Sequence, residues 1–163
     1  MRRAVCAALA LMLVLGLAAC GGNGGSAAGP VELGESLVAR AENLPDMTCV
    51  SSEGKDATGA ELFPYLSDMD YSKVAGYYLA YSTAGSAEEI AVIRVKDAAA
   101  LPEAKASLER HLENRAGLFR TYDPEQAAML GKAEIVAAGD TAALIICENA
   151  SELASALRGE ING

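Results

Sequence analysis

His111 is the only histidine of the chain, so every reaction that needs an imidazole must use it. A Ser-His-Asp triad or a zinc site would surround it with a nucleophile or with further ligands. The sequence contains no G-x-S-x-G turn, and no second histidine or cysteine stands at metal-ligand spacing from it. We therefore interpret His111 as a surface or boundary residue, and we predict no catalytic residue, no metal site and no cofactor.

An acidic stretch offers a second kind of chemistry. Asp68, Asp70 and Ser72 alternate like the first ligands of a calcium loop, but Lys73 stands where that loop needs glycine. This pattern favours an acidic loop over a cation site. A hydrolase that uses acidic residues of segment 46–72 stays open as an alternative, which would need paired carboxylates with one raised pKa.

The amino terminus has the pattern of a cleaved export signal. Two arginines precede an apolar run from residue 4 to residue 16, and the sequence LAAC ends the segment at Cys20. The run is shorter than the roughly 20 residues that a spanning helix needs. The pattern resembles the lipobox of bacterial lipoproteins, in which Cys20 would receive a diacylglycerol and become the first residue of the mature chain.

Three regions follow from this reading. We predict a lipoprotein signal peptide over residues 1–19, a lipid anchor with a flexible Gly-rich linker over residues 20–30, and a single small domain over residues 31–163. The chain carries 13 basic and 22 acidic residues, for a formal net charge of −9. Such an acidic surface disfavours nucleic acid as a partner.

Cys49 and Cys147 are the cysteines that lie beyond the lipid attachment site. A disulfide between them is allowed outside the cytoplasm, and would stabilise the fold by about 4–5 kcal/mol in the chain-entropy treatment. The alternative is two unpaired buried thiols, because free cysteine behaves as a small apolar residue. No C-x-x-C motif is present, so redox catalysis is not expected.

Three of the six tyrosines fall on one predicted strand. Tyr77 and Tyr81 face one side of that strand, while Tyr78 faces the other. One hypothesis is that Tyr77 and Tyr81 form a binding surface, because tyrosine is enriched at interfaces. The alternative is that their rings close the edge of the core and leave the hydroxyls in water.

The apolar spacing predicts an α+β fold in the order α-ββ-α-ββ-α. Two hairpins would form a four-stranded antiparallel sheet, with the helices packed on one face. Segment 46–72 reads as irregular apart from a short helix, and Asn149 reads as the N-cap of the last helix. The predicted strands are 74–81, 89–96, 133–138 and 141–147, and the predicted helices are 34–44, 58–66, 98–118, 124–130 and one that starts after Asn149.

Several of these pieces resemble domain-of-unknown-function family 4358. They are EIAVIRVKD at 89–97, the long helix after it, FRTYDPEQAAML at 119–130 and the apolar strand before Asn149, within about residues 34–158. That family consists of small lipoproteins, mostly of Gram-positive bacteria. The resemblance implies a surface location, and it supplies no established activity and no catalytic residues.

The sequence therefore predicts a bacterial lipoprotein anchored through Cys20 to the extracytoplasmic face of the cell membrane. Its domain is expected to be a non-enzymatic binding or accessory module, with an envelope protein as its partner. The small envelope hydrolase of segment 46–72 is the alternative. A solute-binding protein with two lobes would need a longer chain.

Overall fold

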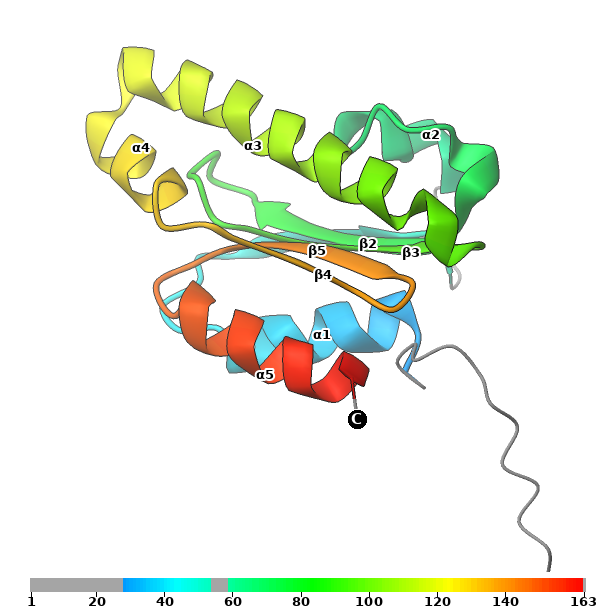
Figure 1. Cartoon of the computed structure of the whole chain (residues 1–163). Helices are drawn as coiled ribbons and strands as arrows, with labels where there is room; N and C mark the ends of the chain where they lie inside the picture. The colour runs from blue at the N-terminus through cyan, green and yellow to red at the C-terminus, as the bar shows by residue number, and fades with distance from the viewer. Residues whose placement is uncertain (1–27, 54–58, 163) are drawn as a thin grey trace, which may run out of the picture.

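The structure, a computed structural model, describes residues 28–53 and 59–162. Its centre is a five-stranded sheet in the order β1-β2-β3-β5-β4, and every neighbouring pair is antiparallel (Figure 1). Four strands match the two predicted hairpins to within one residue at each end. The strands are β1 Met47–Ser51, β2 Val74–Ser82, β3 Glu89–Val95, β4 Glu134–Ala138 and β5 Thr141–Ile146.

The prediction of four strands is wrong because β1 lies in the segment that reads as irregular. Its sequence, MTCVS, is short and has no alternation of apolar and polar residues. Pairing with β2, from Met47 opposite Ser82 to Ser51 opposite Tyr78, makes it a strand. Such an edge strand depends on its neighbour and leaves little trace in its own sequence.

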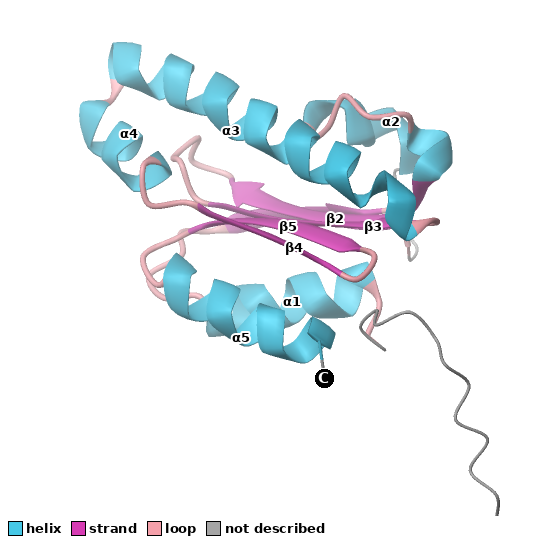
Figure 2. Cartoon of the chain, in the orientation of Figure 1, coloured by secondary structure: helices cyan, strands magenta, loops and turns pink. Residues whose placement is uncertain are grey.

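Helices cover both faces of the sheet, so the prediction that they lie on one face is wrong. Helices α1 (Pro30–Arg40) and α5 (Ala150–Asn162) lie on one face, which we call the α1/α5 face. Helices α2 (Gly59–Leu62), α3 (Leu101–Tyr122) and α4 (Pro124–Leu130) lie on the other, the α2/α3 face (Figure 2). The reason is that every residue of β5 is buried, so the central strands are apolar on both sides and need two covers.

Two local features differ from the sequence prediction at the ends of helices. Pro30, assigned to the linker, is the first residue of α1, which ends at Arg40 rather than at residue 44. The side chain of Asn149 does not cap α5. It accepts a hydrogen bond from the Glu42 amide at 3.0 Å and donates one to the Arg40 carbonyl at 3.1 Å. Asn149 thereby ties the end of α1 to the start of α5.

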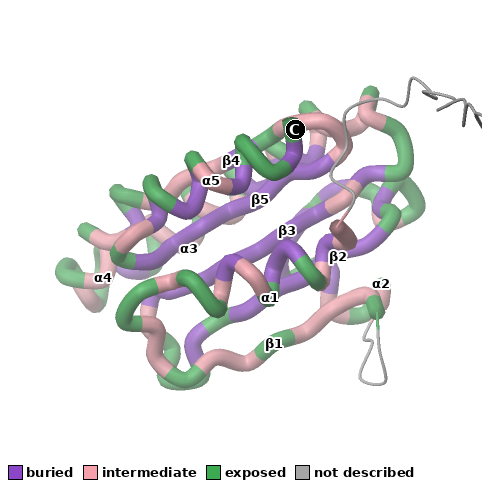
Figure 3. Tube along the Cα trace, turned by 90° about the horizontal axis from the view of Figure 1, so that it is seen from below, coloured by how far each residue is buried: buried purple, intermediate pink, exposed green. Residues whose placement is uncertain are grey.

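A separate apolar core fills each side of the sheet. Burial is continuous along β5, is interrupted on β3 at Arg94, and falls off at the edge strand β1 (Figure 3). On the α1/α5 face the fit is close at Gly34, where an added Cβ atom would lie 2.1 Å from Cδ1 of Tyr78. Only glycine lets α1 approach the Tyr78 ring this closely.

Candidate binding site

The α2/α3 face is hollowed into a pocket of about 400 Å³ above β1, β2 and the start of β3. Its floor is part of the sheet, where Val50 lies opposite Leu79 and Tyr81 lies opposite Glu89. Because alternate residues of a strand share a face, Leu79 and Tyr81 both point to this side. The floor is therefore mostly apolar, with one carboxylate at its end.

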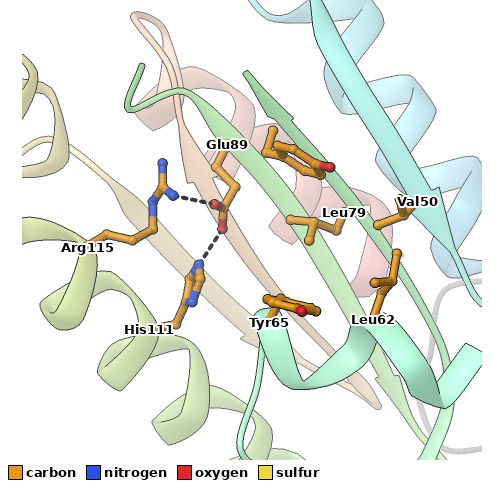
Figure 4. A pocket seen from close by; sticks show the side chains of 8 residues that line it. Val50, Leu62, Tyr65, Leu79, Glu89, His111 and Arg115 are labelled. Atoms are coloured by element: carbon orange, nitrogen blue, oxygen red, sulfur yellow. Dashed lines mark hydrogen bonds and ion pairs between the residues drawn. The ribbon is translucent and has the colours of Figure 1, made fainter. Parts of the chain in front are cut away.

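Two helical segments form the walls of the pocket (Figure 4). Leu62 and Tyr65 come from α2 and from the 3₁₀ turn that follows it, and Tyr65 is 74% exposed at the rim. The ring of buried Phe63 anchors this segment, with its centroid 5.2 Å from the Tyr77 ring. His111 and Arg115 stand four residues apart on α3 and therefore project from the same helix face.

Glu89 is the polar centre of the pocket, although its side chain is only 2% exposed. Its Oε1 lies 2.7 Å from Nε2 of His111, and its Oε2 lies 3.3 Å from Nη1 of Arg115. Arg115 also donates to the Ala87 carbonyl at 3.1 Å. A buried carboxylate is costly unless it is paired and hydrogen-bonded, so Glu89 needs both partners.

The contact with Glu89 also fixes how His111 presents its second nitrogen. A carboxylate only accepts hydrogen bonds, so Nε2 of His111 carries the hydrogen in this contact. Nδ1 has no hydrogen-bond partner among the described residues. In the neutral ring that nitrogen is an acceptor, which suits it to receive an N–H or O–H group from a ligand.

The sequence analysis missed Glu89 and Arg115 as site residues. Alternate residues of a strand share a face, so Glu89 lies on the same side of β3 as Ala91 and Ile93, which are both buried. A charged residue on a buried face needs a partner, and Arg115 follows the only histidine by four residues. Those two signals together point to this cluster. His111 lies at the boundary of the fold, with its side chain 16% exposed.

The hypothesis of a tyrosine surface needs correction at Tyr77. Tyr77 is fully buried, and its hydroxyl donates a hydrogen bond to the Gly59 carbonyl at 3.0 Å. Tyr81 is 38% exposed and lines the pocket. The two side chains share a face of β2, as predicted, but α2 and its 3₁₀ turn cover Tyr77.

Cys49 and Cys147 are both free thiols in the structure. Strands β2 and β3 lie between β1 and β5, which separates the two cysteines by about 14 Å at 4.8 Å per strand, too far for a disulfide. Cys147 is buried, and this burial raises the pKa of its thiol. Cys49 is exposed on β1, where its Sγ accepts a hydrogen bond from the Tyr78 hydroxyl at 3.1 Å.

Asp68 and Asp70 of segment 46–72 are each held by a different partner and do not pair with each other. Asp68 binds Arg110 at 2.5 Å, and this hydrogen bond lowers the pKa of the Asp68 carboxyl. Asp70 accepts from the Ser72 amide at 2.9 Å, which lowers the pKa of Asp70. A general acid requires the opposite shift. No cluster of metal-binding side chains occurs within residues 28–53 and 59–162.

Cys20 and the predicted signal peptide, residues 1–19, lie outside the described residues. In the part of the chain that the structure describes, no helix is both long enough and apolar enough to cross a bilayer. That part begins at Ala28, whose carbonyl accepts a hydrogen bond from Nη2 of Arg94 at 2.6 Å. This bond fixes the start of the domain to the end of β3.

Fold and site together define a class of protein, a small domain with an antiparallel sheet between two helical layers and a pocket on one face. The chain belongs to the family described as Domain of unknown function (DUF4358), whose model matches residues 50–147, more than half of the chain. The match is shorter than the resemblance over residues 34–158. It leaves out α1 and α5 and contains every residue that lines the pocket. Comparisons with curated proteins and with solved structures return no match.

Proposed function

We propose that this chain is an extracytoplasmic lipoprotein, anchored in the cell membrane through Cys20, whose domain is a non-enzymatic binding module of the cell envelope. The basic and apolar leader that ends at Cys20 supports the anchor. The net charge of −9 supports a domain that stays hydrated above anionic lipid headgroups. The pocket around Glu89 is the site at which we expect binding.

The position of the pocket relative to the start of the domain carries this proposal. The Ala28 carbonyl accepts a hydrogen bond from Arg94. Arg94 lies on the same side of β3 as the residues that face α1 and α5, because alternate residues of a strand share a face. Glu89 lies on the other side of β3 and five residues before Arg94, which is about 17 Å along an antiparallel strand. A tether that joins the domain at Ala28 therefore reaches it on the face opposite the pocket and leaves the pocket uncovered.

The lining of the pocket supports binding more than chemistry. Three aliphatic and two tyrosine side chains surround the ion cluster, and Glu89 and Arg115 bind each other. Among the described residues that line the pocket, none carries an aliphatic hydroxyl or a thiol that could act as a nucleophile. Mostly apolar walls with a few fixed polar groups are typical of ligand sites.

A small envelope hydrolase is the second candidate, and one observation favours it. Glu89 orients His111 and leaves Nδ1 unpartnered among the described residues, an arrangement that suits a general base. Release of nitrophenol from p-nitrophenyl acetate tests this candidate. A rate that disappears in His111→Gln would favour the hydrolase, and equal rates in both proteins would favour the binding module.

Two labels in intact cells test the main proposal. A clickable fatty acid should label the wild-type chain and fail to label Cys20→Ala. In a Cys49→Ala background, a bulky membrane-impermeant maleimide should react faster at Tyr65→Cys, on the pocket rim, than at Glu32→Cys, in the first turn of α1. Fatty-acid label that persists in Cys20→Ala, or maleimide label that appears only after lysis, would overturn the proposal.

A further inference from the structure

A second hollow adjoins the pocket along α3. It has a volume of about 190 Å³ and is bordered by Ser107 and Asn114 of α3 and by Asp68 on the facing segment. Tyr65 and His111 border both hollows. The two hollows therefore form one depression between α3 and the segment from α2 to Asp68, which we call the α2–α3 groove.

The groove is long enough for an extended chain. Its α3 border runs from Ser107 to Arg115, which is about 12 Å at 1.5 Å per helical residue. An extended polypeptide covers that distance with three or four residues. A compact small molecule would occupy one hollow, whereas an extended segment would cross Tyr65 and His111 and use both.

The charged groups that face each other across the groove are opposite in sign. Glu89 pairs with Arg115 at the pocket end, at 3.3 Å, and Asp68 pairs with Arg110 at the other end, at 2.5 Å. Within each pair the positive and negative charges cancel, although the whole chain carries a net charge of −9. A groove whose ion pairs balance favours an uncharged ligand that offers dipoles, such as peptide groups, over a free anion or cation.

The remaining contacts also select among ligands. In the neutral ring, Nδ1 of His111 is an acceptor with no partner among the described residues, and a main-chain N–H would satisfy it. At the pocket end, Val50, Leu62 and Leu79 offer an apolar recess for one large side chain. A glycan would leave hydroxyl groups unpaired against these three residues, which costs free energy.

We propose that the α2–α3 groove binds an extended peptide segment of an envelope protein. One aliphatic or aromatic side chain of the segment enters the recess between Val50, Leu62 and Leu79. A main-chain amide of the segment donates to Nδ1 of His111, and the chain continues over Tyr65 toward Asp68. This inference rests on the proposed function, because it assigns a ligand class to the same pocket.

Selection from a random-peptide phage library on the full chain, purified in mild detergent, tests the inference. The selected peptides should share one Leu, Ile, Phe or Tyr at a fixed position, and replacing that residue by Ser should abolish binding. Tyr65→Ala should weaken binding of a selected peptide at least tenfold. Tyr122→Ala is the matched control, because Tyr122 is 64% exposed at the far end of α3, and it should change the Kd less than twofold.

Three results would overturn the inference. The first is a selection whose peptides share no consensus, and the second is a set of peptides that bind Tyr65→Ala as well as they bind the wild-type chain. The third is a glycan array on which the wild-type chain binds an envelope oligosaccharide and Tyr65→Ala does not. The glycan result would leave the proposed binding module standing and change only its ligand class. A wild-type chain that takes up no fatty-acid label, or cysteine variants that react with maleimide only after lysis, would instead contradict the proposed function, whatever the library yields. Thermal melting of both tyrosine variants confirms that they are folded.

Discussion

The two faces of the sheet are built for different purposes. On the α1/α5 face the apolar core is closely packed, and α1 approaches so closely that Gly34 meets the ring of Tyr78. On the α2/α3 face the helices leave a pocket of about 400 Å³ and enclose the charged side chain of Glu89. One face thus gains stability from close packing, and the other gives up packing for a site.

The difference shows how a small domain carries a polar pocket. An ion cluster that is removed from water contributes little net stability, because desolvation offsets the attraction between its charges. A void likewise forfeits dispersion contacts. The apolar cores on both faces must therefore compensate for the pocket and its ion cluster, and mutations of the ion cluster and of the packed α1/α5 core should destabilise the fold for different physical reasons.

The largest effect is expected at Glu89. Glu89→Ala leaves Arg115 and His111 without their buried partner, and removal of one member of a buried ion pair costs about 3–5 kcal/mol in the free energy of unfolding. Urea unfolding measures this loss. Glu103→Ala is the control, since its pair with Lys73 is solvent-exposed and contributes about 1 kcal/mol or less. Equal losses in the two variants would show that the cluster is not a buried ion pair.

Gly34 gives the next largest effect, on the opposite face. In Gly34→Ala the new Cβ would lie 2.1 Å from Tyr78, and forcing an extra carbon into a packed core costs about 1–3 kcal/mol. Gly117→Ala, in α3, meets no atom within 4 Å and should instead stabilise by up to about 1 kcal/mol through helix propensity. Thermal unfolding should therefore shift in opposite directions, and a shared direction would refute the close contact.

Sequence patterns predicted the parts of the fold whose structure is decided locally. The predicted strands β2 and β3 and helix α4 are confirmed, because the composition and apolar spacing that predicted them are local to each segment. Strand β1 and the second helical layer were not predictable in this way, because pairing between distant segments decides them. The candidate site needs both kinds of information, since Glu89 and Arg115 meet only when α3 crosses the sheet.

Asn149 should show a smaller effect, and it separates a tertiary role from a local one. Asn149→Ala removes the hydrogen bonds to Arg40 and Glu42 at the end of α1, at 3.1 and 3.0 Å, together with a weaker one from the Cys147 thiol, and should cost about 1 kcal/mol in the free energy of unfolding. Asn114→Ala, which removes an exposed side chain on α3, should change stability by less than about 0.5 kcal/mol. If a serine at position 149 restored full stability, ordinary helix capping would explain the residue instead.

The smallest expected effect is a response to alkaline pH on the α1/α5 face. Burial raises the pKa of the Cys147 thiol and of the Tyr78 hydroxyl, so the folded state holds both protons more tightly than the unfolded state. Stability is then fully present below the ordinary thiol pKa of about 8.5, and it falls as the pH rises above that value and again above about 10. Melting temperatures between pH 7 and pH 11 measure this decline.

Two variants assign the alkaline decline to its groups. Cys147→Ala should remove the first part of the decline and Tyr78→Phe should lessen the second, because each variant deletes one proton that the folded state retains. Asp68, on the α2/α3 side, has a lowered pKa and contributes stability that is lost as the pH falls. Tyr71, which packs against the α2/α3 core, also has a pKa raised by burial, so it adds to the loss of stability above about pH 10. An unchanged alkaline decline in the double variant would place its origin outside the α1/α5 core.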